Sequence, residues 1–293
     1  MPVTPSGLFW DSRGPKDAPA VLLIEGHTAQ MIGWREPFCD ALARRGLRVL
    51  RMDNRDAGFS RHELGGYDLR DMAIDVRDVI RDAGVTQATL VGQSMGGMIA
   101  QHTALRYPDV VAGLVLFYTT PNIVDIHPDI LTSQVALVEN REDAVEAFLD
   151  GDRATASPAW GYDEAFKREL ANRMYDRDPS RRGYQNQRDA IARMPDLTQD
   201  LRQVAVPTAI IHGRADAMIS PRGSERIAQS IAHSELHMYP GMGHEIAPAL
   251  WGDFEVIISR VARARQASAG QGGPIAAHPR SPHGDESSAA LAH

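Results

Sequence analysis

The stretch that decides the fold is "ATLVGQSMGGMIA", residues 88–100. A short apolar run at 88–92 leads into a serine between glycines, and the pattern of an apolar helix follows at once. Apolar runs of this length, bounded by glycine, are typical of strands that are covered on both faces. We therefore predict a strand, a tight turn at Ser94, and a helix that packs close to the strand.

The same alternation of strand and helix extends through much of the chain. Further Val-, Ile- and Leu-rich runs predict strands at 20–25, 47–52, 113–118, 207–212 and 235–239. Residues 68–83 place apolar side chains at steps of three and four, which predicts a helix that Gly84 ends. Strands that alternate with helices indicate an α/β protein, with a mostly parallel sheet covered by helices on both faces.

The alternation stops in the middle of the chain, where only helical patterns occur. These patterns lie at 127–140, 142–150, 160–176 and 180–194. We interpret them as an inserted helical cap, after which Pro207 restarts the sheet. The predicted organisation is a first part of the core at 1–120, the cap at 121–197, a second part of the core at 198–265, and a tail at 266–293.

The predicted tail has too few apolar residues to offset the entropy of ordering, so we expect it to be disordered. It contains His278, His283 and His293, but their spacing and surroundings do not fit a metal site.

The composition limits the partners and the location of the protein. The chain has 293 residues with 43% hydrophobic and 24% charged, a balance typical of globular proteins. A net charge of −7 argues against a nucleic acid or an anionic membrane as partner. There is no signal-peptide pattern and no membrane-spanning apolar run, so a cytoplasmic location is expected. The single Cys39 excludes an intrachain disulfide, and the oligomeric state does not follow from the sequence.

The glycines around Ser94 match the G-x-S-x-G pattern of a nucleophile elbow. Such a turn strains the backbone of the serine and leaves no room for side chains two positions to either side, which explains Gly92 and Gly96. The turn lifts the hydroxyl above the sheet at a helix N-terminus, where the helix dipole favours developing negative charge. A serine nucleophile also needs a base and a group that orients the base.

Asp216 and His244 are the predicted partners of Ser94. Each follows a predicted strand, and parallel strands share one carboxyl edge, so all three side chains are expected at the same rim. The order Ser, Asp, His is the one that this architecture uses. Asp125 is the alternative acid, and the side chain of His27 is disfavoured as the base because it precedes Ser94.

A serine nucleophile also requires two backbone N–H groups aimed at the developing oxyanion. The N–H of Met95, directly after the nucleophile, is the first candidate. The N–H of His27, in the loop after the strand at 20–25, is the second.

These motifs, with "EGH" at 25–27 and "DNRDAGFS" at 53–60, resemble the α/β-hydrolase superfamily over about residues 8–265. The stretches "AQMIGWREPFCDALARRGLRVLRMDNRDAGFS" (29–60) and "PGMGHE" (240–245) are similar to the branch that contains the aclacinomycin methylesterase of anthracycline biosynthesis. The resemblance implies an ester hydrolase, and it implies that Asp53, Arg55 and Gly58 form a structural turn.

Two positions depart from this family pattern. Many relatives have His-Gly where this chain has Glu25-Gly26, and often Pro where it has Ala217. We hypothesise that Glu25 is a hydrogen-bonded structural residue. The alternative is that it faces the pocket and selects a cationic or hydroxyl-bearing substrate.

The predicted function is therefore that of a serine esterase acting through an acyl-enzyme on Ser94. The substrate would be a small-molecule ester, for example a methyl ester of an aromatic, polyketide-like product of antibiotic biosynthesis. Candidate substrate-binding residues come from the cap and from the loop after residue 25, namely Glu25, Met31, Trp34, Trp160 and Tyr184. No motif for a metal, nucleotide or flavin is present, so no cofactor is expected.

Other reactions on the same scaffold stay open. A serine nucleophile argues against haloalkane dehalogenases and epoxide hydrolases, which use Asp in its place. Carbon–carbon hydrolases, thioesterases and perhydrolases share the same triad, and a non-hydrolytic tailoring enzyme or a binding protein is a further alternative.

Overall fold

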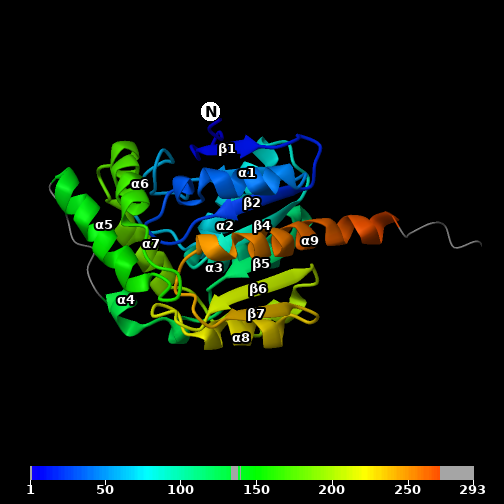
Figure 1. Ribbon diagram of the computed structural model, residues 1–293. Coiled ribbons are helices and arrows are strands. Elements are labelled where there is room, and N and C mark those ends of the chain that lie inside the picture. Colours follow the sequence, from blue (N-terminus) through cyan, green and yellow to red (C-terminus); the bar gives the residue numbers. More distant parts are fainter. Residues whose placement is uncertain (1, 133–137, 139, 271–293) are drawn as a thin grey trace, which may run out of the picture.

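The computed structural model describes residues 2–132, 138 and 140–270. Its centre is a seven-stranded sheet with the order β1-β3-β2-β4-β5-β6-β7 (Figure 1). The strands are β1 (Trp10–Arg13), β2 (Ala20–Ile24), β3 (Arg48–Met52), β4 (Ala88–Gln93), β5 (Val111–Phe117), β6 (Thr208–Gly213) and β7 (Glu235–Tyr239). Strand β1 pairs antiparallel with β3, and every other neighbouring pair is parallel.

The α/β fold class predicted from the sequence is confirmed, and one strand was missed. The sequence predicted β2 to β7 to within a few residues. Strand β1 was not predicted because it has only 4 residues, "WDSR", and lies at the edge of the sheet. Such a short, largely polar segment carries no buried apolar run that distinguishes it from a loop.

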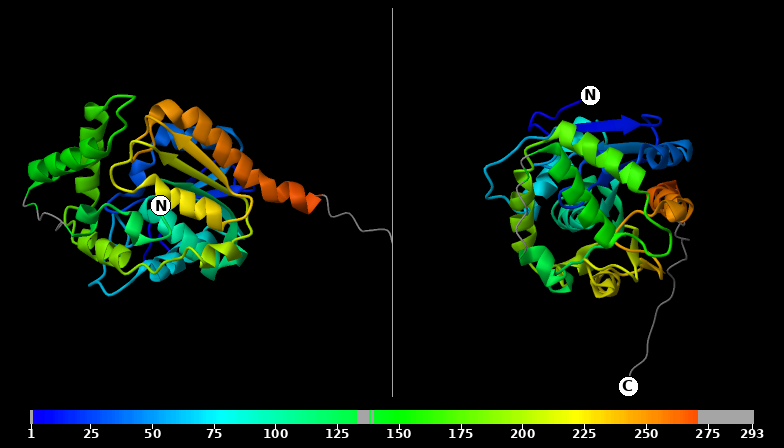
Figure 2. Two further views of the ribbon diagram at one scale, coloured as in Figure 1. Left: turned by 90° about the horizontal axis from the view of Figure 1, so that it is seen from below. Right: turned by 60° about the vertical axis from the view of Figure 1, so that its left-hand side comes forward.

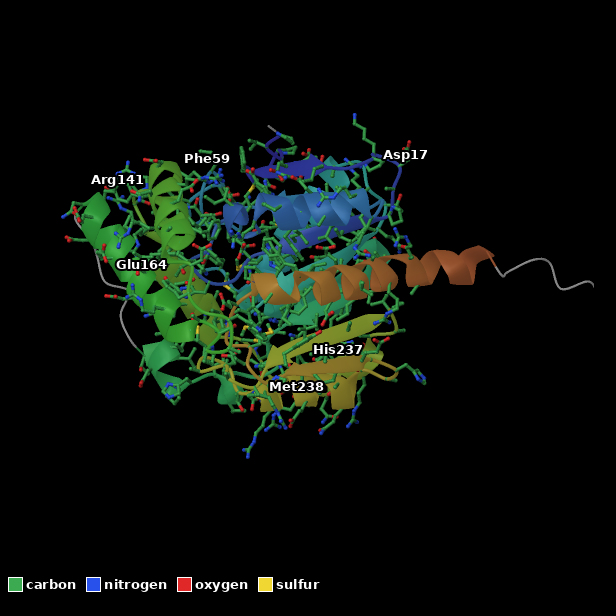
Figure 3. All side chains as sticks on the ribbon, viewed as in Figure 1. Asp17, Phe59, Arg141, Glu164, His237 and Met238 are labelled. Atoms are coloured by element: carbon green, nitrogen blue, oxygen red, sulfur yellow. The ribbon has the colours of Figure 1, made fainter. Side chains whose placement is uncertain are left out.

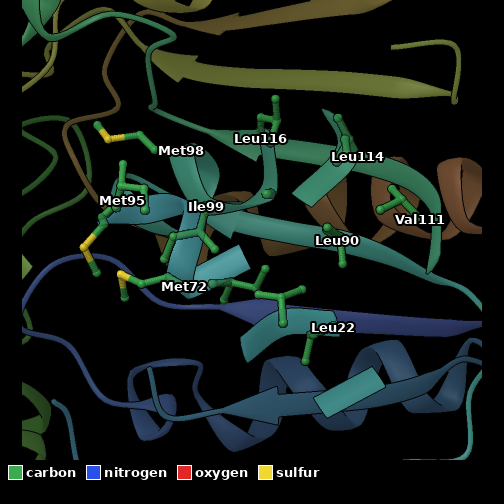
Figure 4. Packing of buried hydrophobic residues seen from close by; sticks show 14 of the residues in the cluster. Leu22, Met72, Leu90, Met95, Met98, Ile99, Val111, Leu114 and Leu116 are labelled. Atoms are coloured by element: carbon green, nitrogen blue, oxygen red, sulfur yellow. The ribbon is translucent and has the colours of Figure 1, made fainter. Parts of the chain in front are cut away.

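Helices cover both faces of the sheet (Figures 1 and 2). One face carries α1 (Glu36–Arg44) and α9 (Trp251–Gly270), and the other carries α2 (Leu69–Asp82), α3 (Met95–Arg106) and α8 (Pro221–Ser230). Side chains alternate along each strand, so Leu22 and Leu90 face α2 and α3 while Val21 and Val91 face α1 and α9. Figure 4 shows the layer between the sheet and helices α2 and α3.

Helix α2 begins and ends where the sequence predicts. The Asp68 side chain accepts hydrogen bonds from the N–H groups of Arg70 (2.7 Å) and Asp71 (3.3 Å), and so caps the helix. Gly84 follows with φ 65°, and the N–H of the next residue bonds to the carbonyl of Ile80 at 3.1 Å. This left-handed ending favours glycine, which has no Cβ.

The helical insertion lies between β5 and β6, at the carboxyl ends of the strands (Figure 2). It contains α4 (Pro128–Thr132), α5 (Arg141–Thr155), α6 (Glu164–Arg177) and α7 (Gly183–Ala192). The predicted helix 127–140 corresponds to α4 in its first part, and residues 133–137 and 139 lie outside the described residues. Short 3₁₀ helices complete the fold: η1 (Met31–Gly33), η2 (Pro108–Val110), η3 (Ile123–Asp125), η4 (Asp200–Gln203) and η5 (Pro248–Leu250).

Polar contacts connect the cap to the core. Arg177, at the end of α6, forms an ion pair with the buried Asp53 after β3. The side chain of Gln30 donates to the carbonyl of Met174 at 2.9 Å. On the outer side of the cap, Arg141 and Glu164 lie at the surface (Figure 3).

Helix α9 continues to Gly270, beyond residue 266 where the sequence predicted the tail to begin. The rest of the predicted tail lies outside the described residues. Among the described residues, no helix is long and apolar enough to cross a membrane.

Candidate active site

Ser94 occupies the turn between β4 and α3 in a strained backbone conformation. Its φ is 54° and its ψ is −120°, values that a residue with a side chain adopts only where the surroundings enforce them. Its N–H bonds to the carbonyl of Phe117 at 3.0 Å, which ties the turn to β5. The first turn of α3 begins at Met95, so the serine lies at a helix N-terminus.

The glycines two positions to either side of Ser94 are required by space. A Cβ at Gly92 would lie 2.3 Å from the carbonyl oxygen of Gly96, and a Cβ at Gly96 would lie 2.2 Å from that of Ile24. Both obstacles are backbone atoms, which cannot move away as a flexible side chain would. The structure therefore leaves no room for a side chain at either position, as the sequence pattern predicted.

Asp216 and His244 meet at the same rim as Ser94. His244 Nδ1 donates to Asp216 Oδ2 at 2.7 Å, and both Ser94 and His244 line one cavity. A neutral imidazole that donates through Nδ1 leaves Nε2 as an acceptor, which is the tautomer that a general base needs. The ring of Tyr118 packs on the imidazole, with centroids 4.5 Å apart.

The environment of Asp216 favours its ionised form. Burial alone would raise the pKa of this carboxyl, but the charge of His244 and hydrogen bonds from His212, His244 and the Ile219 N–H hold it well below its ordinary value. The second oxygen, Oδ1, accepts from the N–H groups of Met218 at 2.8 Å and Ile219 at 3.0 Å. A carboxylate fixed in this way orients the imidazole and stabilises its protonated form.

The alternative acid, Asp125, has different partners. It is buried, and its Oδ2 accepts from Arg226 Nε at 3.0 Å and from Thr120 Oγ1 at 3.2 Å. The structure therefore brings His244 together with Asp216 and not with Asp125.

The loop after β2 lies directly against the serine. A Cβ at Gly26 would lie 3.2 Å from Ser94 Cβ, so the backbone of this loop approaches the nucleophile closely. Among the described residues, the N–H groups of His27 and Met95 have no hydrogen-bond acceptor. Two free donors beside a serine hydroxyl are the arrangement that an oxyanion hole needs.

The side chain of His27 has a structural contact. Its Nε2 lies 2.7 Å from the carbonyl of Tyr184, which requires a proton on that nitrogen. Burial lowers the pKa of His27 to about 4, the Tyr184 carbonyl opposes this shift, and the charge of Arg188 adds to it. A neutral imidazole that donates to the cap agrees with the choice of His244 as the base.

A cavity of about 670 Å³ lies between the rim of the sheet and the cap. Its lining is largely apolar and aromatic, and it includes Phe148, Tyr162, Phe166, Leu170 and Tyr175 from the cap. An apolar enclosure with a few polar groups is typical of a site for a small organic molecule.

The predicted substrate-binding residues divide into two groups. Glu25, Trp34, Trp160 and Tyr184 line the cavity. Met31 lies outside the cavity lining, and its side chain packs in a buried cluster with Phe9, Leu170 and Met174. Met31 therefore lies behind the cavity lining, packed against Leu170 and Met174, which do line it.

The turn at residues 53–60 has the structural role that the family resemblance implies. Arg55 forms a buried two-point ion pair with Asp75, at 2.5 and 2.8 Å. Asp53 accepts from the N–H groups of Met31 at 2.8 Å and Phe59 at 3.1 Å. Gly58 has φ 58°, and a Cβ there would lie 2.4 Å from the Asp53 carboxylate.

Residues that the sequence did not single out also shape the site. The cap holds the loop that carries His244: the His244 N–H bonds to the carbonyl of Thr155 at 2.8 Å, and the Gly243 N–H bonds to Ser157 Oγ at 3.0 Å. Gln93 and Tyr118 form a partly buried hydrogen-bonded pair beside the serine and the imidazole. Only the position of Gln93 within the G-x-S-x-G pattern pointed to the site.

Within the described part of the chain, no group of three or more His, Cys, Asp or Glu residues is arranged to hold a metal ion.

The mostly parallel sheet, the strained serine turn and the inserted cap define an α/β-hydrolase. A family model described as "Hydrolase_4: Serine aminopeptidase, S33" matches residues 15–248. The chain belongs to this family of serine hydrolases within the α/β-hydrolase superfamily.

Named relatives of the chain cover several activities. It is 31% identical to "Putative carbamate hydrolase RutD" of Variovorax paradoxus (strain S110), over 81% of this chain and 89% of that protein. It is 29% identical to "Bifunctional esterase/perhydrolase DCH" of Acinetobacter calcoaceticus, with the same two coverages of 81% and 89%.

A solved structure confirms the fold. The meta-cleavage product hydrolase CumD of Pseudomonas fluorescens IP01 superposes with a TM-score of 0.70 at 23% identity, covering 88% of this chain and 94% of that one. Together with the family model, these relatives place the chain among the serine hydrolases. The particular link to aclacinomycin methylesterase finds no counterpart among them.

Proposed function

We propose that this protein is a carboxylic ester hydrolase that forms an acyl-enzyme on Ser94. The observation that carries the proposal is the 2.7 Å hydrogen bond between His244 and Asp216 at the rim where a strained turn presents Ser94. An orienting carboxylate, a base and a hydroxyl at a helix N-terminus are the parts that acyl transfer needs.

The proposed reaction proceeds in two halves. Ser94 Oγ attacks the ester carbonyl while His244 Nε2 takes its proton, and the N–H groups of His27 and Met95 bind the oxyanion. Collapse of this intermediate breaks the bond to the alcohol oxygen, which receives the proton from His244. Water then attacks the acyl-enzyme by the same route, releases the acid, and restores the serine.

The proposed substrate is a bulky, partly aromatic ester. The cavity volume of about 670 Å³ and its aromatic lining support an organic group of that size. A methyl ester of a polyketide-like product is the finer form of this proposal, and it rests on the resemblance of residues 29–60 and 240–245 to the methylesterase branch.

Perhydrolysis is the second candidate, because one relative is named as a bifunctional esterase and perhydrolase. In that reaction hydrogen peroxide replaces water in the second half and converts the acyl-enzyme into a peracid. Adding hydrogen peroxide to the ester assay distinguishes hydrolysis from perhydrolysis. A perhydrolase would form the peracid, whereas an esterase would still form the carboxylic acid.

The first experiment is reaction with a fluorophosphonate, followed by measurement of the intact mass. The wild type is expected to gain a single adduct, and Ser94→Ala and His244→Ala are expected to gain none. Both substitutions should lower kcat by about 10³-fold or more in ester assays. No adduct on a folded wild-type protein would overturn the proposal.

A further inference from the structure

Glu25 is a buried carboxyl beside the reacting atoms that the two-step reaction leaves without a role. It directly follows β2, lines the cavity, and is only 1% exposed. Its Oε2 accepts hydrogen bonds from the Gly26 N–H at 3.3 Å and from the side-chain amide of Gln93. Among the ion pairs of the described residues, none includes Glu25.

The surroundings of Glu25 favour the neutral acid. Burial raises the pKa of Glu25 to about 8. Hydrogen bonds from the Gly26 N–H, the Gln93 amide and the Trp34 N–H oppose the shift, and the nearby Asp53 adds to it. Since Oε2 accepts from two N–H groups, the proton belongs on Oε1. That atom has no hydrogen-bond partner among the described residues, and it lies against Gly33, where a Cβ would come within 2.7 Å of it.

A chain of contacts links this carboxyl to the catalytic groups. The amide of Gln93 donates to Glu25 and accepts from the Tyr118 hydroxyl, and the Tyr118 ring packs on His244. Gln93 directly precedes Ser94. Glu25 therefore contacts the nucleophile turn and the oxyanion loop, and through Tyr118 it supports one face of the imidazole.

We propose that Glu25 is a positioning residue of the hydrolytic reaction and that it acts as the neutral acid, holding Gln93 and Gly26 so that the serine turn and the oxyanion loop keep their geometry. The inference rests on the proposed function. It differs from a purely structural role for Glu25, because it predicts that the rate of the reaction depends on the protonation state of this carboxyl.

Ionisation of Glu25 would oppose the reaction. Gly26 is the residue directly after Glu25 in the chain. A Cβ at Gly26 would lie 3.8 Å from Ser94 Oγ. A negative charge there would repel the oxyanion that forms beside the same loop. Two like charges within about 10 Å of each other at an effective dielectric constant of about 20 slow such a step by about tenfold or more.

The other titratable groups around this chain of contacts are few. Asp53, paired with Arg177 of α6, faces Glu25 from the loop after β3. The groups around Tyr118 are His244, Asp216, Glu245 and Asp152. Burial holds the pKa of Tyr118 well above its ordinary value, so the phenol keeps its proton where Glu25 ionises.

The test is the pH dependence of fluorophosphonate inactivation, because this reaction requires an activated Ser94 but not the unknown substrate. Glu25→Gln is the informative variant: glutamine has the shape of the neutral acid and both an acceptor and a donor, but it does not ionise. The rate constant for the wild type is expected to fall about tenfold or more above about pH 8. That of Glu25→Gln should be up to about fivefold lower at pH 7 and should show no alkaline fall.

Two variants serve as controls. Glu164→Gln removes an exposed carboxyl of the cap and should retain the alkaline fall. Tyr118→Phe removes the hydroxyl that bonds to Gln93, so it should slow the reaction about threefold to tenfold at every pH and keep the fall, because Glu25 still titrates.

The outcomes separate this inference from the proposed function. An unchanged alkaline fall in Glu25→Gln would overturn the inference alone, as would a loss of about a hundredfold at pH 7 in a folded variant. No reaction of the wild type at any pH would overturn the proposed function and the inference together. If Glu25→Gln does not fold, infrared spectra of the wild type decide: a protonated carboxyl band that disappears between about pH 7 and 9 supports the inference, and its absence overturns it.

Discussion

The serine turn and the histidine loop deliver their catalytic side chains to one rim by different means. The turn at Ser94 is fixed by the core itself, through the hydrogen bond to the Phe117 carbonyl and through backbone atoms packed against Gly92 and Gly96. The loop at His244 is held by the cap, through Thr155 and Ser157. The position of the nucleophile is thus a property of the folded sheet, whereas the position of the base depends on an inserted segment.

The largest effect is expected from Gly96→Ala, which tests the serine side of this comparison. The new Cβ would lie 2.2 Å from the carbonyl oxygen of Ile24 and 2.7 Å from that of Glu25, so the sheet and the helix would have to separate. The free energy of unfolding should fall by more than about 3 kcal/mol in urea titrations followed by circular dichroism.

Gly151→Ala is the matched control for Gly96→Ala. Nothing lies within 4 Å of a Cβ at this position of α5, so the substitution should be neutral or stabilise by up to about 1 kcal/mol. Equal stability of the two variants would show that the close approach at Gly96 does not hold the turn.

The next effect is the acid sensitivity of the helix that begins at the serine turn. Burial lowers the pKa of His102 in α3 to about 4, the charge of Asp68 opposes the shift, and the charge of Arg70 adds to it. The unfolded chain takes up the proton near pH 6.5, so stability is lost as the pH falls from about 6.5 to about 4. At pH 5 this loss amounts to about 2 kcal/mol.

His102→Leu should remove that loss, which urea titrations at pH 7 and pH 5 would measure. The variant should keep about 2 kcal/mol more of its pH 7 stability at pH 5 than the wild type does. His237→Gln, at a more exposed position on β7, is the control and should follow the wild type. A parallel pH dependence in His102→Leu would contradict the assignment of acid sensitivity to α3.

Sequence patterns predicted the serine side better than the histidine side, for a physical reason. The constraints on Ser94 come from Gly92 and Gly96, neighbours in sequence, and they are visible in five consecutive residues. Asp216 and His244 followed from their places after two predicted strands, of which β6 is buried and β7 is half-buried at the edge of the sheet. Their meeting at 2.7 Å requires the parallel register of β6 and β7, which the alternation of strands and helices already implied.

What the sequence could not predict depends on contacts between distant segments. Thr155 and Ser157 meet the loop at 243–245 only because the cap folds back over the rim. Met31 was expected at the pocket from its place in the chain, but the direction of its side chain is set by packing against the cap helix α6. Neither contact leaves a local periodicity or a short motif.

Ser157→Ala tests the histidine side, and its main effect should appear in activity. Ser157 Oγ is buried and accepts from the Gly243 N–H, so the substitution leaves that donor unpaired next to His244. Loss of one such hydrogen bond corresponds to about 1 kcal/mol or slightly more, and kcat should fall about tenfold. KM should change little, and the free energy of unfolding should fall by no more than about 1–2 kcal/mol.

Ser234→Ala is the control for this experiment, since its hydroxyl bonds to the Ala228 carbonyl far from the site and kcat should not change. If Ser157→Ala kept full activity, the cap would not be needed to hold the histidine loop, and the contrast between the two regions would disappear.

The smallest effect is expected on the outer side of the cap. A substitution there tests whether parts of the cap far from Thr155 and Ser157 also help to position His244. Arg141 joins α5 to α6 through an ion pair with Asp176, and both side chains are about half exposed. Water and salt screen such a pair, and the two long side chains lose rotamer freedom in forming it. Arg141→Gln should therefore leave kcat unchanged in the assay used for Ser157→Ala. A tenfold loss here as well would mean that the cap positions His244 as one rigid body, and that the short segment 155–157 has no special part in holding it.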